Sequence, residues 1–267
     1  MGILEGEILI MMKYVECTSR GMTLRGMMHL PEGEGPFPFA IILHGLYDDG
    51  PEINYVHTEL SRRLEKEGIG SVRFDFAGCG NSDGEHENMT ISGEAADACA
   101  MLDWLKKQPF ADPARIAFHG LSLGGCVASM AAGMRHDEVA ALSLWCPAPD
   151  VVTHMREKMV CNVPVPDIDK TYGDIEGLKL GRGFYEDCCR IDPFEVASAF
   201  KGPVNLVHGD ADIVASWHCS ERYKEIFGEK ARLTIIHGAG HHFESVAWRE
   251  ARMVSAIGFL KETLLGV

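Results

Sequence analysis

The chain has 267 residues, enough to bury a large core and few enough for one α/β domain to account for all of it. Because 46% of the residues are hydrophobic and 24% are charged, the composition is that of a globular protein and argues against disorder. The formal net charge of -14 would repel phosphate backbones and anionic bilayers, so we expect neither a nucleic acid nor a membrane as partner.

The N-terminus and the cysteines together predict a cytoplasmic protein. Glu5 and Glu7 stand where a signal peptide needs positive charge, and no small-residue cleavage site follows. A second start at Met11 or Met12 would make residues 1–11 an extension without a role in the fold. The nine cysteines form no CxxC pair, and their odd number favours reduced thiols over a disulfide framework.

The regular structure is expected to begin with a hairpin and to continue as alternating strands and helices. Residues 13–18 and 23–30 alternate in polarity around a short turn, which predicts an antiparallel pair at a sheet edge. Short apolar runs then alternate with helical patterns, which predicts a parallel sheet covered on both faces. The expected strands are 39–45, 69–78, 114–120, 138–146, 203–209 and 231–238, and the expected helices are 53–68, 92–107, 126–134, 217–227 and 243–264. We therefore predict one α/β domain over residues 1–267, built on a mostly parallel, eight-stranded sheet.

One long segment interrupts this alternation. Residues 147–190 scatter Pro, Gly and Asp among apolar residues before the next strand pattern begins. A long irregular insertion in a compact domain is usually a lid or a binding loop. Met155 and Met159, within it, are candidates for lining a pocket, with a homodimer contact as the alternative.

The motif GLSLGG, residues 120–125, lies between a predicted buried strand and a predicted helix. This is the context of a nucleophile elbow. Gly120 and Gly124 leave space for a sharp turn that exposes the Ser122 hydroxyl, and the helix start places the N–H of Leu123 beside it. A bare GxSxG arises by chance, but in this context Ser122 is the candidate nucleophile.

A serine nucleophile requires a base and an acid, and two later motifs offer both. HGDAD follows one predicted strand and carries Asp210 and Asp212, while GAGHHF follows the next and carries His241 and His242. All would emerge at the same edge of the sheet as Ser122. The spacing alone does not decide which aspartate is the acid or which histidine is the base. If Asp210 and His242 are not part of the triad, we expect a turn carboxylate at Asp210 and a partly exposed loop residue at His242.

The tetrahedral intermediate needs two N–H groups that point at its oxyanion. The turn His44-Gly45-Leu46 ends a predicted strand, so the N–H of Leu46 would join that of Leu123. We expect His44 itself to brace the turn.

Two further patterns argue against a cofactor or metal. FAGCGNSDG, residues 76–84, follows a strand but lacks the GxGxxG spacing of a dinucleotide loop, so we expect a tight turn there. His86 and Glu87 lack the second histidine of HExxH. The predicted chemistry therefore uses no cofactor and no metal.

With these motifs the chain resembles the α/β-hydrolase superfamily over essentially its whole length. The residues that carry the likeness are LHG at 43–45, FDFAGCGNSDG at 74–84, DPARIAFHGLSLGG at 112–125, HGDAD at 208–212 and GAGHHF at 238–243. TLRGMMHLPEG at 23–33 and residues 177–204 are similar to the bacterial feruloyl (cinnamoyl) esterases, the latter to the end of their lid.

The resemblance implies a site and a substrate class. It selects Ser122, Asp212 and His241 as triad and Leu46 and Leu123 as oxyanion amides, and it places a lid at 147–190. Such esterases often carry Phe and Gln where this chain has Leu46 and Leu123, which implies a more aliphatic acyl pocket. The resemblance also implies that Tyr185 and Asp150 are candidates for a contact with a phenolic hydroxyl of the substrate.

The resulting hypothesis is a cytoplasmic serine ester hydrolase that forms an acyl-enzyme on small esters, with hydroxycinnamate esters as the specific substrates. In the alternative hypotheses the same triad hydrolyses a different bond, as in an acylglycerol lipase, a thioesterase or a peptidase-like hydrolase. A hydrolase-like binding protein without turnover is the alternative from another class.

Overall fold

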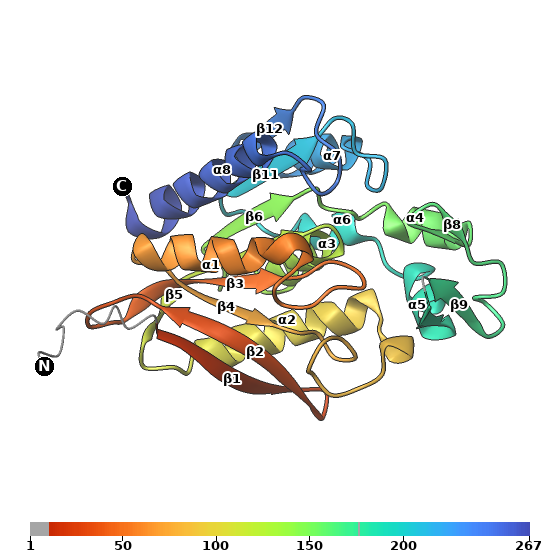
Figure 1. Ribbon diagram of the computed structural model, residues 1–267, viewed down its shortest axis with the longest axis horizontal. Helices are drawn as coiled ribbons and strands as arrows, with labels where there is room; N and C mark the ends of the chain where they lie inside the picture. Colours follow the sequence, from red (N-terminus) through yellow and green to blue (C-terminus); the bar gives the residue numbers. More distant parts are fainter. Residues whose placement is uncertain (1–10, 176) are drawn as a thin grey trace, which may run out of the picture.

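The computed structural model describes residues 11–175 and 177–267. A mixed eight-stranded sheet forms its centre, with the strand order β1-β2-β4-β3-β5-β6-β11-β12 (Figure 1). The strands are β1 (Met11–Ser19), β2 (Met22–Leu30), β3 (Phe37–Leu43), β4 (Gly70–Phe74), β5 (Ala111–Leu121), β6 (Ala141–Trp145), β11 (Val204–Gly209) and β12 (Ala231–Ile236). All neighbours from β4 to β12 are parallel, whereas β1 and β2 pair antiparallel at one edge. The predicted fold class is confirmed.

The conformation of the turn between β1 and β2 explains why these two strands form a hairpin. Arg20 and Gly21 both have positive φ, at 49° and 78°, which matches the twist of the two strands. The expected extension over residues 1–11 lies outside the described residues, apart from Met11, where β1 begins and pairs with Leu30.

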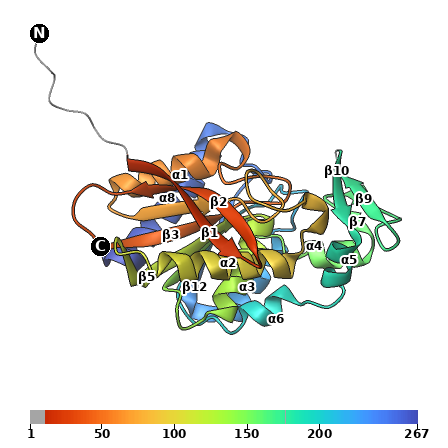
Figure 2. The same cartoon turned by 90° about the horizontal axis from the view of Figure 1, so that it is seen from below.

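Helices cover both faces of the sheet (Figure 2). Helices α1 (Val56–Lys66) and α8 (Val246–Leu265) pack on one face. Helices α2 (Ile91–Leu105), α3 (Leu123–Met134) and α7 (His218–Phe227) pack on the other. The short elements are α6 (Pro193–Ala197) and the 3-10 turns η1 (Ile53–Tyr55), η2 (His86–Asn88) and η3 (Gly228–Lys230). No helix in the described ranges is long and apolar enough to cross a bilayer.

The segment between β6 and β11 is more regular than its sequence indicates. It contains α4 (Val151–Arg156), the pair β7 (Met159–Val160) and β8 (Val163–Pro164), the pair β9 (Tyr172–Ile175) and β10 (Leu178–Gly181), and α5 (Arg182–Cys188). Strands of two to four residues are too short to produce a periodic pattern. Met155 is fully buried in the main core. The part of this segment from α4 to α5 lies at one end of the molecule, past the ends of the central strands, whereas α6 lies beside α3 (Figure 1).

Candidate active site

Ser122 occupies a strained turn between β5 and α3. Its φ of 56° and ψ of -122° lie outside the regions that L-residues usually adopt. A Cβ on Gly120 would lie 2.2 Å from the carbonyl oxygen of Gly124, and one on Gly124 would lie 2.3 Å from that of His44. The Ser122 N–H donates to the carbonyl oxygen of Trp145 at 3.0 Å. The glycines therefore allow the close packing that presents the serine hydroxyl.

Ser122, His241 and Asp212 form a continuous hydrogen-bonded chain. His241 Nε2 lies 2.9 Å from Ser122 Oγ, and His241 Nδ1 lies 2.6 Å from Asp212 Oδ2. Asp212 Oδ1 also accepts from the backbone N–H groups of Val214 and Ala215. The carboxylate is thus held from the loop after β11, while the imidazole comes from the loop after β12.

His208, at the end of β11, is a further partner that the sequence did not single out. Its Nε2 lies 3.2 Å from Asp212 Oδ2, and its Nδ1 lies 2.7 Å from Ser220 Oγ on α7. Burial opposes ionisation of Asp212, but the hydrogen bonds from His208 and His241 outweigh it and hold the pKa of Asp212 below its ordinary value. Asp212 is therefore an anion that orients His241.

A second residue that the sequence did not reveal is Cys146, directly after β6. Its fully buried thiol donates to the carbonyl oxygen of His241 at 3.3 Å. Burial disfavours the charged imidazole, but the hydrogen bond to Asp212 and the negative charge of its carboxylate outweigh it and raise the pKa of His241 above its usual 6.5. Cys146 thus contacts the backbone of His241, while Asp212 increases the basicity of its imidazole.

The turn after β3 carries Leu46 to the site and is braced from within. His44 is fully buried, with Nδ1 2.8 Å from the Gly45 carbonyl oxygen and Nε2 accepting from the Phe76 N–H, as expected of a bracing residue. Glu52 Oε2 accepts from the Gly45 N–H at 2.5 Å. Burial and the neighbouring Asp48 raise the pKa of Glu52 to about 8.

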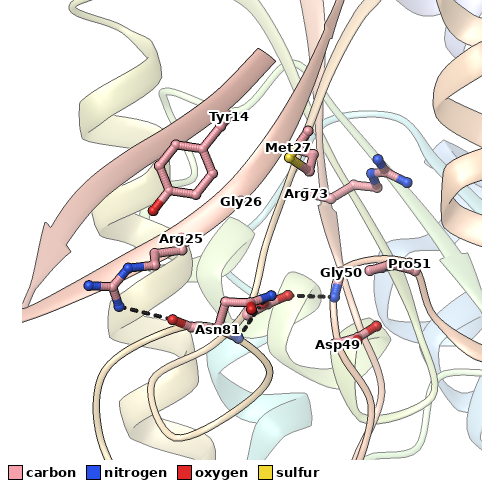
Figure 3. Close-up of a pocket in the computed structure, with 10 residues that line it drawn as sticks. Tyr14, Arg25, Gly26, Met27, Asp49, Gly50, Pro51, Arg73 and Asn81 are labelled. Atoms are coloured by element: carbon pink, nitrogen blue, oxygen red, sulfur yellow. Dashed lines mark hydrogen bonds between the residues drawn. The ribbon is translucent and has the colours of Figure 1, made fainter. Parts of the chain in front are cut away.

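Asp49, Gly50 and Pro51 of the same loop line a separate small hollow (Figure 3). There, Asp75 Oδ1 accepts from the Gly50 N–H at 2.7 Å, and Asp75 Oδ2 accepts from the Asn81 N–H at 2.7 Å. A Cβ on Gly80 would lie 2.2 Å from Asp75 Oδ2. The glycine-rich loop after β4 therefore forms a tight turn that ties Asp75 to the loop carrying Leu46.

Two adjoining hollows meet at Ser122 and share Leu46, Cys161 and Val214. We call the first, of about 280 Å³, the acidic lobe; it is also lined by Gly45, Tyr47, Asp48, Glu52, Leu121, Val163, Ile175, His241 and His242. We call the second the apolar lobe; it is also lined by Leu123, Ala148, Asp150, Val151 and His154. The segment between β6 and β11 contributes to both lobes.

A family model described as X-Pro dipeptidyl-peptidase (S15 family) matches residues 21–171, more than half of the chain. The chain belongs to the S15 family. It is a hydrolase-type enzyme with an α/β-hydrolase fold.

Relatives of this S15-family chain include proteins of different description. An uncharacterized protein of Mycobacterium tuberculosis is 29% identical over 246 residues, covering 92% of the chain and 78% of that protein. The esterase FrsA of Escherichia coli is 27% identical over 165 residues, covering 60% of the chain and 36% of FrsA.

Solved structures place the S15-family chain in the α/β-hydrolase fold. Est1E from Butyrivibrio proteoclasticus, with ferulic acid bound, superposes with a TM-score of 0.85 at 23% identity, covering 94% of this chain and 99% of Est1E. An esterase of Pyrococcus furiosus gives a TM-score of 0.71 at 21% identity, covering 95% and 93% of the two chains. The resemblance to the α/β-hydrolase superfamily that the sequence motifs indicate is confirmed.

The remaining predicted positions of the S15-family chain have distinct surroundings. Asp210 accepts from the Gly238 N–H at 2.7 Å and pairs with His237, away from Ser122. His242 is half-buried and lines the acidic lobe. Asp150 lines the apolar lobe and accepts from the Ser216 N–H at 2.9 Å. Tyr185 lies on α5, partly buried against the core, and is outside the described lining of both lobes.

Proposed function

We propose that the chain is a serine carboxylic-ester hydrolase with Ser122 as nucleophile. The observation that carries the proposal is the hydrogen-bonded chain from Ser122 Oγ through His241 to Asp212, beside two hollows that meet at Ser122. A serine hydroxyl in contact with an oriented histidine can be deprotonated as it attacks an ester carbonyl.

In the proposed reaction, His241 takes the Ser122 proton and later gives it to the leaving alcohol. The N–H groups of Leu46 and Leu123 stabilise the oxyanion. Water then gives a proton to His241 as it attacks the acyl-enzyme, and His241 returns that proton to Ser122 Oγ as the acid leaves. Asp212 stays ionised throughout and keeps His241 Nδ1 protonated. These steps assign no role to a cofactor or a metal.

We propose hydroxycinnamate esters as the preferred substrates, with the segment 147–190 as the lid over them. The structural likeness to Est1E with ferulic acid bound supports this choice. The apolar lobe, of about 20 Å³, has space for a water-sized group only, so the aromatic acyl group would lie against Leu123, Ala148 and Val151 after a movement of the lid. Asp150 is a hydrogen-bonding group in the same lobe. Tyr185 would reach the phenolic hydroxyl only after a movement of the lid.

A peptidase-like activity is the second candidate. The S15 family match supports it, because that family is described as X-Pro dipeptidyl-peptidase. The acidic lobe, where Asp48 and Glu52 lie together, would offer carboxyl oxygens as hydrogen-bond acceptors to a substrate with an amino group.

A hydrolysis panel distinguishes these readings. We would compare kcat/KM for methyl ferulate, chlorogenate, p-nitrophenyl acetate, butyrate and octanoate, a thioester and glycyl-proline p-nitroanilide. We expect methyl ferulate to exceed the aliphatic esters and Ser122→Ala to reduce kcat by roughly 10³-fold or more. Preference for the p-nitroanilide would replace the ester assignment, and activity that survives Ser122→Ala would refute the mechanism.

A further inference from the structure

Several polar side chains are buried together in the core between the sheet and the helices α1 and α8. His57 comes from α1, His119 from β5, Trp145 from β6 and Arg252 from α8, and all four are fully buried. We call these four residues the buried donor cluster. None of the four residues is among the described lining of the two lobes at Ser122, and the reaction proposed above does not use their side chains.

The four side chains surround the indole ring of Trp145. The ring centre of Trp145 lies 4.3 Å from that of His119 and 6.3 Å from that of His57. The guanidinium carbon of Arg252 lies 4.8 Å from the same ring. Residues on four separate elements, spread over nearly 200 positions of the chain, thus converge on one point in the core.

Most nitrogen atoms of the buried donor cluster have no hydrogen-bond partner among the described residues. They are Nε, Nη1 and Nη2 of Arg252, Nε1 of Trp145, both ring nitrogens of His57 and Nε2 of His119. Guanidinium and indole N–H groups can donate but not accept. The cluster therefore has a large excess of donors over acceptors, and it calls for a group rich in lone pairs.

The positive charge of Arg252 also favours a group that supplies lone pairs. Burial lowers the pKa of Arg252 to about 10, which leaves it protonated at neutral pH. The two acids near enough to act on Arg252 have other partners: Glu52 accepts from the Gly45 N–H, and Glu59 accepts from Arg63 and Arg249. Stacking on Trp145 and Phe243 offsets only part of the cost of burying a cation.

We infer that the buried donor cluster binds a small inorganic anion, of the kind represented by chloride, between Arg252, the Trp145 indole N–H and the histidine rings. An anion would accept from the free N–H groups and neutralise the guanidinium in one step. Complete burial of all four side chains favours a monatomic ion over sulfate or phosphate.

The direct test is a bromide experiment on the wild-type protein. Crystals grown or soaked in sodium bromide would be measured at the bromine absorption edge. We expect an anomalous peak between Arg252 and Trp145. A site that shows only water density, with no anomalous signal, would overturn the inference.

Thermal unfolding supplies the test in solution. We expect Tm to rise saturably, by about 3 °C, when chloride replaces gluconate at constant ionic strength. Arg252→Met should abolish this rise. Arg249→Met, which alters an arginine of the same helix already paired with Glu59, should retain it.

If Arg252→Met fails to fold, Trp145→Phe serves instead, because it keeps an aromatic ring and removes only the indole N–H donor. It should weaken the chloride dependence of Tm. Equal Tm values in chloride and gluconate for the wild type would contradict the inference, as would a chloride effect that survives in Arg252→Met.

Discussion

Asp210 and Asp212 stand two residues apart, yet only Asp212 contacts His241. We predict that Asp212→Asn lowers kcat by about 10⁴-fold, because an amide no longer holds His241 in the tautomer that accepts the Ser122 proton. Asp210→Asn is the matched control, since it removes a carboxylate from the neighbouring turn, and its kcat should stay near the wild-type value. Equal losses in the two variants would contradict the assignment.

The carboxylate of Asp212 gives a prediction for pH dependence. His241 must be deprotonated to act as base, so kcat/KM is lost as pH falls through its pKa, which Asp212 raises against the effect of burial. The residual activity of Asp212→Asn should therefore have the acid limb of its kcat/KM profile at lower pH. Asp210→Asn should leave the limb in place. A limb that does not move in Asp212→Asn would show that the carboxylate has no influence on the pKa of His241.

At the scale of elements, the packing of α3 against the end of β3 sets the position of Ser122. Gly124→Ala would place a Cβ 2.3 Å from two backbone oxygens, so we predict a loss of about 2–3 kcal/mol in the free energy of unfolding. Gly258→Ala, in open space on α8, should instead stabilise by about 0.5–1 kcal/mol. Urea unfolding of both variants measures the difference, and equal stabilities would refute this account of the elbow.

Strong local periodicity made the central elements predictable. The buried strands and the helices α1 and α8 appear close to their expected bounds, because a continuous apolar run or a helical repeat reports burial directly. The segment between β6 and β11 does not carry such a signal. Its small hairpins are stabilised by contacts with distant parts of the chain, such as the bond from Asn162 Nδ2 to the Ile213 carbonyl oxygen at 2.8 Å.

At the scale of the whole molecule, the same distinction separates predicted from unpredicted site residues. Ser122, Asp212 and His241 sit in short motifs at strand ends, so the parallel topology brings them together. Glu52 and Cys146 have no motif of their own. Their roles arise from contacts across the fold, namely the Glu52 bond to Gly45 and the proximity of Cys146 to His241.

The central claim is that Ser122 is an activated nucleophile, and covalent labelling tests it most directly. The protein would be incubated with a fluorophosphonate and its intact mass and peptide map measured. We predict one adduct, on the peptide that contains Ser122, absent in Ser122→Ala and formed much more slowly in His241→Ala. No adduct on the wild type, or one that persists in Ser122→Ala, would contradict the account.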